Sequence, residues 1–204
     1  MTGIKNIIFD LGGVLLDLDF NKTFSAFKEL GIKNFEEMFS QHHANKLFEK
    51  LETGKISEEG FYTTVKELIP GTVSDEQVTK AWNAMMLDFR TDSVDVLERI
   101  SKDYRLFLLS NTNSIHLRQF KKIFTRDTGK LLLEEYFNKC WYSHIIGLRK
   151  PDKEVYEFVL HDEDLKVAET FFIDDTIENI NAAKELGIKT HLLIPGERIG
   201  QLGF

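Results

Sequence analysis

The chain has 204 residues, of which 42% are hydrophobic, so it fits one catalytic domain with a modest insertion and is not a disordered chain. Its formal net charge of −7 argues against nucleic acid or an anionic membrane as partner, because neutralising phosphates requires concentrated Lys and Arg. Cys140 is the single cysteine, which excludes an internal disulfide, and from the sequence we expect neither a signal peptide nor a transmembrane helix. We therefore expect a cytoplasmic protein.

Four apolar runs along the chain are each too short for a helix: Ile7–Phe9, Leu106–Leu109, Phe171–Ile173 and Leu192–Ile194. Amphipathic segments precede two of them. One covers Asp92–Lys102, and the other covers Asn179–Leu186 and is ended by Gly187. Apolar runs that alternate with amphipathic helices indicate parallel strands covered on both faces. The expected fold class is therefore α/β, with a doubly wound parallel sheet.

The segment between the first two runs has a different pattern, because helices follow helices there. The expected helices are Phe20–Leu30, Ala44–Leu51, Phe61–Leu68 and Val78–Met86. Ser57 has the position of an N-cap, and Ser74 and Gln77 have the spacing of a capping box. The pattern predicts a catalytic core, residues 1–16 and 91–204, interrupted by a helical cap, residues 17–90.

Chemistry-bearing residues follow the expected strands, at the sheet edge where ligands bind in such folds. They are Asp10, Gly12, Ser110, Asn111, Asp174 and Asp175, with Lys150 at the start of a further helix. Three carboxylates that converge repel one another unless a cation neutralises them, and Mg²⁺ prefers such an all-oxygen site. The metal, Lys150 and the Ser110 hydroxyl could then hold a phosphate group while one carboxylate attacks phosphorus.

These segments resemble the four motifs of the haloacid dehalogenase (HAD) superfamily: Ile8-Phe-Asp-Leu-Gly-Gly-Val-Leu15, Leu109-Ser-Asn-Thr-Asn113, Arg149-Lys-Pro-Asp152 and Phe172-Ile-Asp-Asp175. Two further segments, Asp17–Asn21 and Glu52–Ser57, are similar to those of bacterial α-D-glucose-1-phosphate phosphatases. The superfamily resemblance implies a Rossmann-like core and a set of site roles. Asp10 is then the nucleophile and a metal ligand, the Gly12 carbonyl, Asp174 and Asp175 are the other ligands, Ser110 and Asn111 bind phosphate, and Lys150 bridges nucleophile and phosphate.

Gly12 departs from the family pattern, because most family phosphatases have an aspartate there as general acid and base. Such a group contributes about 10²–10⁴-fold to the rate. Asp17 and Asp19 are near in sequence, but nothing in the sequence assigns them this role. We hypothesise that water or a cap carboxylate, with Glu52 as one candidate, replaces it. Alternatively, the enzyme prefers leaving groups that need little protonation, such as that of a sugar 1-phosphate.

The expected function is a Mg²⁺-dependent phosphatase that acts on a small phosphorylated metabolite through an aspartyl phosphate. Cap loops near Asn21, Lys46 and Glu52–Lys55 are expected to set its specificity, whereas His42 and His43 are expected to be structural or solvated. One alternative is a 2-haloacid dehalogenase, which the paired Asp174 and Asp175 oppose. Another is a phosphate-binding regulator without catalysis, which Gly12 favours.

Overall fold

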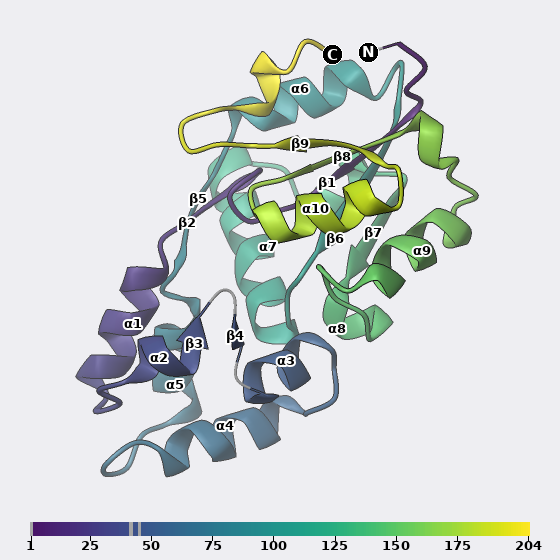
Figure 1. Ribbon diagram of the computed structural model, residues 1–204. Coiled ribbons are helices and arrows are strands. Elements are labelled where there is room, and N and C mark those ends of the chain that lie inside the picture. Colours follow the sequence, from purple (N-terminus) through teal and green to yellow (C-terminus); the bar gives the residue numbers. More distant parts are fainter. Residues whose placement is uncertain (1, 41–42, 45) are drawn as a thin grey trace.

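The computed structural model describes residues 2–40, 43–44 and 46–204, and its centre is a five-stranded parallel sheet (Figure 1). The strand order is β7-β6-β1-β8-β9, which places the first strand in the middle. The strands are β1 (Asn6–Phe9), β6 (Arg105–Ser110), β7 (Lys139–Tyr142), β8 (Thr170–Asp174) and β9 (Lys189–Leu192). The α/β fold class expected from the sequence is confirmed.

Helices cover both faces of this sheet, which explains why the middle residues of its inner strands are apolar. Ile7 and Phe9 pack on the face covered by α6 (Asp92–Ile100) and α7 (Ser114–Thr128). Ile8 between them packs on the other face, against α9 (Lys153–Asp162) and α10 (Ile177–Glu185). Successive side chains of a strand point to opposite faces, so a strand covered on both faces has apolar residues at successive positions.

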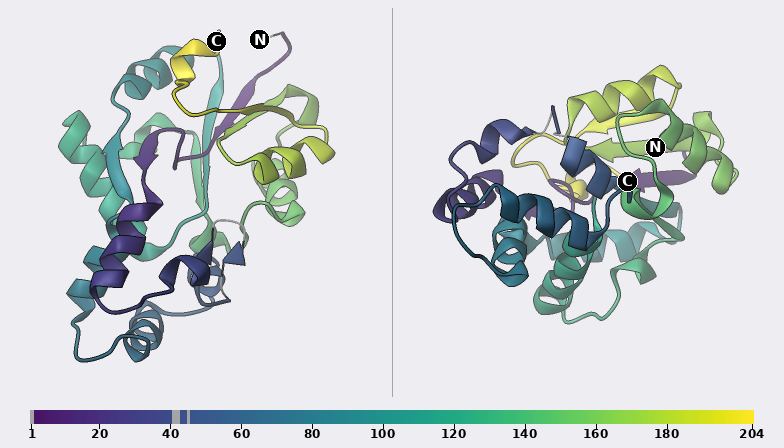
Figure 2. Two further views of the ribbon diagram at one scale, coloured as in Figure 1. Left: turned by 60° about the vertical axis from the view of Figure 1, so that its left-hand side comes forward. Right: turned by 90° about the horizontal axis from the view of Figure 1, so that it is seen from below.

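The helical segment from Phe20 to Asn83 forms a second hydrophobic cluster around Trp82. This segment lies to one side of the sheet (Figure 2). Ser57 and Ser74 cap two of its helices as predicted, and Ser74 forms the capping box with Gln77. Its elements are α1 (Phe20–Glu29), α2 (Phe35–Met38), β3 (Phe39–Ser40), β4 (His43–Ala44), α3 (Lys46–Glu52), α4 (Glu58–Glu67) and α5 (Asp75–Asn83). This separate cluster supports the proposed cap, whose bounds stay a prediction.

Two short antiparallel strands, β2 (Leu16–Leu18) and β5 (Met86–Phe89), carry the chain into and out of this helical part. The expectation that the last cap helix reaches Met86 is wrong. Helix α5 ends at Asn83, and Met86 instead pairs with Leu18 in the two-stranded sheet. A four-residue run of apolar character does not by itself distinguish helix from strand.

Other boundaries also differ from the expectation. The last strand is β9 at Lys189–Leu192 rather than at 192–194, because its register against β8 pairs Asp174 with Leu192. Ala44 belongs to β4, and α3 begins at Lys46; His42 and Asn45 lie outside the described residues. The edge strand β7 was not expected, nor was the short α8 (Ser143–Ile146). Within the described residues, 3₁₀ turns also occur at Leu133–Tyr136, Val167–Glu169 and Ile199–Gln201.

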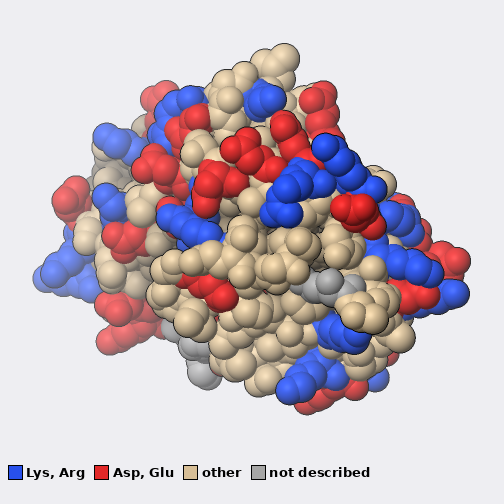
Figure 3. All heavy atoms as spheres, turned by 90° about the horizontal axis from the view of Figure 1, so that it is seen from above, with Lys and Arg blue, Asp and Glu red and all other residues tan. Residues whose placement is uncertain are grey.

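The surface of the molecule mixes charges of both signs on the face that carries the chain termini (Figure 3). Lys and Arg side chains there are interspersed with Asp and Glu rather than gathered into one basic patch. Within the described part of the chain, every helix is too short or too polar to pass through a membrane.

Candidate active site

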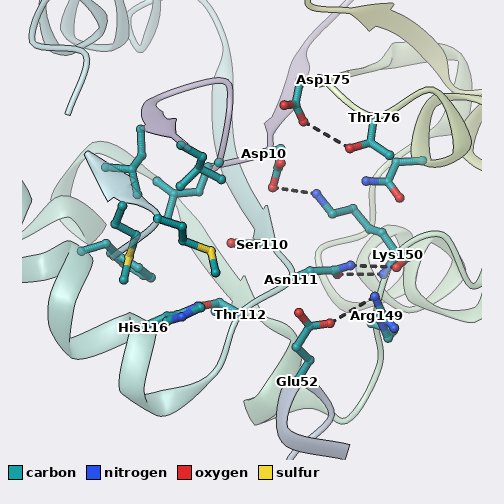
Figure 4. A pocket seen from close by; sticks show the side chains of 18 of the residues that line it. Asp10, Glu52, Ser110, Asn111, Thr112, His116, Arg149, Lys150, Asp175 and Thr176 are labelled. Carbon is teal, nitrogen blue, oxygen red and sulfur yellow. Dashed lines mark hydrogen bonds and ion pairs between the residues drawn. The ribbon is translucent and has the colours of Figure 1, made fainter. Parts of the chain in front are cut away.

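A cavity of about 300 Å³ lies at the carboxyl ends of the central strands, between the sheet and the helical part (Figure 4). The turn after β1, the end of β6 and the start of α10 contribute polar residues to it, and α3 contributes Glu52. Its lining includes most of the residues singled out from the sequence: Asp10, Gly12, Glu52, Ser110, Asn111, Lys150 and Asp175. Asp174 lies beside them, hydrogen-bonded to Lys150.

Lys150 is the electrostatic centre of this site. Its Nζ lies 2.7 Å from Asp10 Oδ1 and 2.6 Å from Asp174 Oδ2, and its side chain is only 1% exposed. Burial lowers the pKa of Lys150, but Asp10 and Asp174 outweigh this effect and hold its pKa above the ordinary value. Lys150 therefore stays charged, and a buried charge so paired has a fixed position.

Asp10, Asp174 and Asp175 each offer one carboxylate oxygen, and these oxygens lie within 4.8 Å of one another. Burial raises the pKa of Asp10 to about 7; Lys150 opposes this shift, while Asp174 and Asp175 add to it. Three carboxylates beside one ammonium leave a charge of −2 when all are ionised. A divalent cation would neutralise that charge, and the all-oxygen donor set fits Mg²⁺.

The turn after β1 brings backbone close to this carboxylate group. Gly13 has a φ of +69°, and a Cβ atom there would lie 1.8 Å from Asp175 Oδ2. On the other side, Asp174 accepts hydrogen bonds from the Thr176 backbone N–H and from the Asn179 side chain. Asp175 therefore lies against the turn after β1, whereas its neighbour Asp174 is hydrogen-bonded to the start of α10.

Asn111 positions Lys150 through its backbone. Its Nδ2 donates to the Lys150 carbonyl at 2.7 Å, and the Lys150 N–H donates to its Oδ1 at 2.9 Å. The Asn111 amide is therefore engaged with backbone, although the residue lines the cavity as Ser110 does. Thr112 and Ser143 make a similar reciprocal pair, which joins the ends of β6 and β7.

The space beside Gly12 is apolar. A Cβ atom at Gly12 would lie 2.6 Å from Leu18 Cδ1, and further apolar lining comes from Leu16, Phe20, Met85, Met86 and Phe120. Asp17 pairs with Arg90 at 2.7 Å, and Asp19 caps α1 by accepting from the Asn21 N–H. Neither aspartate lines the cavity, so the structure gives no support to either as the missing acid.

Arg149 and His116 also line the cavity, although their sequence context predicted no role for either. Arg149 pairs with Glu52 across the cavity wall, at 3.1 Å. The His116 ring stacks on Trp82 with its centroid 4.7 Å away, and burial lowers the pKa of His116 to about 4. Arg149 belongs to the motif around Lys150, but its partner Glu52 is distant in sequence, so the motif alone could not predict the pair.

Comparisons with known proteins agree with this architecture. A family model described as haloacid dehalogenase-like hydrolase matches residues 4–187. D-ribitol-5-phosphate phosphatase of Bacteroides thetaiotaomicron is 33% identical over 187 residues, which cover 92% of this chain and 90% of that protein. A sesquiterpene phosphatase of Aspergillus oryzae is 29% identical over 191 residues, which cover 92% of this chain and 88% of that protein.

Among solved structures, an HAD-family enzyme of Bacteroides thetaiotaomicron matches with a TM-score of 0.92 and 38% identity, over 98% of each chain. That crystal structure is of an aspartate-to-alanine variant in complex with magnesium and inorganic phosphate. The narrower resemblance to α-D-glucose-1-phosphate phosphatases stays a prediction. The superfamily expected from the four motifs is confirmed: this chain belongs to the haloacid dehalogenase-like hydrolases.

Proposed function

We propose that this chain hydrolyses the phosphate monoester of a small polyhydroxylated alcohol, with sugar alcohol phosphates of the ribitol 5-phosphate kind as the first candidates. Its enzyme class is a phosphatase of the HAD family, and its metal is Mg²⁺. The observation that carries the proposal is the buried Lys150, held between Asp10 and Asp174 at the end of a cavity that fits a small molecule.

In the proposed reaction, Asp10 attacks phosphorus and the bond from phosphorus to the alcohol oxygen breaks. Bound Mg²⁺ would neutralise charge on the phosphate oxygens, and Lys150 and Ser110 would bind those oxygens. The leaving oxygen takes its proton from water, because Gly12 offers no side chain. Water then attacks the aspartyl phosphate, which releases inorganic phosphate and restores the Asp10 carboxylate.

Asp10, Asp174, Asp175 and the Gly12 carbonyl are the proposed metal ligands. Asn111 is proposed to act through Lys150, whose backbone it holds, in addition to the predicted contact with phosphate. The helical part, residues 17–90, is proposed as the cap that excludes bulk water and selects the alcohol.

Two other substrate kinds have specific support. A sugar 1-phosphate such as glucose 1-phosphate suits the missing acid at Gly12, since its leaving oxygen is more acidic than that of a primary alcohol. An apolar alcohol suits the wall of Leu16, Leu18 and Met86, and one relative is named as a sesquiterpene phosphatase.

The test is phosphate release from ribitol 5-phosphate, glucose 1-phosphate, a prenyl monophosphate and p-nitrophenyl phosphate, with Mg²⁺ or EDTA. We expect Mg²⁺-dependent release by the native chain, fastest from ribitol 5-phosphate, and none by Asp10→Asn. A higher kcat/KM for one of the other two metabolites would reassign the substrate. No release of phosphate from any ester would favour the regulator, and halide release from a 2-haloacid without metal would favour a dehalogenase.

A further inference from the structure

Glu52 and Arg149 form an ion pair on the cavity wall away from the carboxylate group. Figure 4 shows Ser110 and Asn111 between this pair and Asp10. Arg149 Nη2 lies 3.1 Å from Glu52 Oε2, and the two side chains are 19% and 15% exposed. The contact lacks hydrogen-bond geometry, so Glu52 Oε2 and Arg149 Nε are buried without a hydrogen-bond partner among the described residues.

The loop after α3 fixes Glu52 against the sheet domain. Glu52 is the last residue of α3, and the Thr53 hydroxyl donates to the Glu49 carbonyl at 2.8 Å. Gly54 follows with a φ of +66°, and a Cβ atom there would lie 2.4 Å from the His144 carbonyl oxygen. This close approach holds the end of α3 against α8, from which the chain leads to Arg149.

We propose that Glu52 excludes substrates whose alcohol part carries a second anionic group, by occupying Arg149 and presenting a carboxylate to that end of the cavity. The proposal rests on the phosphatase function above. An alcohol long enough to extend from Lys150 past Asn111 brings its far end to this pair. Hydroxyl groups there can donate to the Glu52 carboxylate, whereas a carboxylate or second phosphate meets a like charge.

The charges of the pair explain why removal of Glu52 should reverse the preference. Arg149 without Glu52 is a largely buried guanidinium beside an open cavity, and guanidinium binds carboxylate and phosphate through paired N–H donors. Like charges placed together across a contact repel each other and weaken binding. Glu52→Gln keeps the size of the side chain, so the change is mainly one of charge.

Two substrates that differ at one carbon test this directly: sorbitol 6-phosphate ends in a CH₂OH group where 6-phosphogluconate ends in a carboxylate. We expect the native enzyme to have the higher kcat/KM for sorbitol 6-phosphate. We define the ratio as kcat/KM for 6-phosphogluconate divided by kcat/KM for sorbitol 6-phosphate. Glu52→Gln should raise this ratio at least tenfold. Arg149→Gln should lower the same ratio, because the Glu52 carboxylate is then no longer neutralised by Arg149. The double variant, Glu52→Gln with Arg149→Gln, should lose the rise in the ratio that Glu52→Gln alone produces.

Glu49→Gln is the matched control, since it removes the same charge from an exposed residue of α3 that does not line the cavity. It should leave the ratio within twofold of native. A ratio unchanged in Glu52→Gln, with p-nitrophenyl phosphate still hydrolysed, overturns this inference and leaves the phosphatase intact. Slower release from both sugar phosphates by the same factor, with p-nitrophenyl phosphate little affected, would instead identify Glu52 as a proton donor and also overturn it. No hydrolysis of any ester by the native chain would overturn the proposed function itself.

Discussion

Gly13 and Asp175 approach so closely that a Cβ atom at Gly13 would lie 1.8 Å from Asp175 Oδ2. Gly13→Ala should therefore displace Asp175 and weaken Mg²⁺ binding as well as strain the backbone at a φ of +69°. We expect at least a tenfold higher Mg²⁺ concentration for half-maximal phosphate release, and a smaller rise in melting temperature on Mg²⁺ addition.

Gly129 offers a control with the same backbone strain and no contact. Its φ is +68°, and a Cβ atom there has nothing within 4 Å. Gly129→Ala should cost about 1–2 kcal/mol of stability through the left-handed conformation alone and leave the response to Mg²⁺ as in the native chain. Equal Mg²⁺ responses in both variants would show that the contact with Asp175 has no role in metal binding.

The affinity for Mg²⁺ should fall as the solution becomes more acidic. Burial, with the neighbouring aspartates, raises the pKa of Asp10 to about 7, so below that pH the metal must displace a proton. The apparent affinity should then fall by up to about tenfold per pH unit. Titration of the melting temperature with Mg²⁺ at pH 8 and pH 6 measures this, and an equal affinity at both values would contradict it.

The fold and the carboxylate group could be predicted because their signals are local. A doubly buried strand such as β1 has a continuous apolar run, Ile7–Phe9, and Asp10 follows it directly. β7 was missed because an edge strand tolerates polar residues; Lys139 and Cys140 at its start are only partly buried. The pairs Glu52–Arg149 and His116–Trp82 were missed for another reason. Each joins the helical part to the sheet domain, and that approach is set by tertiary packing.

His116 should make the protein sensitive to acid. Burial lowers the pKa of His116 to about 4 from 6.5, and its Nε2 lies 3.2 Å from the Trp82 carbonyl oxygen. The unfolded chain therefore binds a proton near pH 6.5 that the folded chain binds only near pH 4. Stability from this residue is complete above pH 6.5 and falls as the pH drops towards 4, by about 2 kcal/mol at pH 5.

Glutamine keeps an N–H donor but does not titrate. His116→Gln should therefore remove the part of the loss in unfolding free energy between pH 8 and pH 5 that His116 causes. Urea unfolding at the two pH values gives the free energies needed. His161→Gln, which changes an exposed histidine on α9, is the control and should keep the native loss. Identical losses in the native chain and in His116→Gln would mean that other groups cause the acid sensitivity.

Leu18 occupies the space into which a side chain at residue 12 would extend, because a Cβ atom at Gly12 would lie 2.6 Å from Leu18 Cδ1. Gly12→Asp alone should therefore disturb β2 and give little gain. Gly12→Asp with Leu18→Ala should supply a proton donor, since the apolar wall would raise the pKa of the new carboxyl.

A general acid has the largest effect on the rate when the leaving group is poor. The kcat for an alkyl phosphate, relative to p-nitrophenyl phosphate, should rise about tenfold or more in the double variant. Leu18→Ala alone controls for the enlarged cavity, and a ratio equal to that of this control would exclude the new carboxyl as an acid.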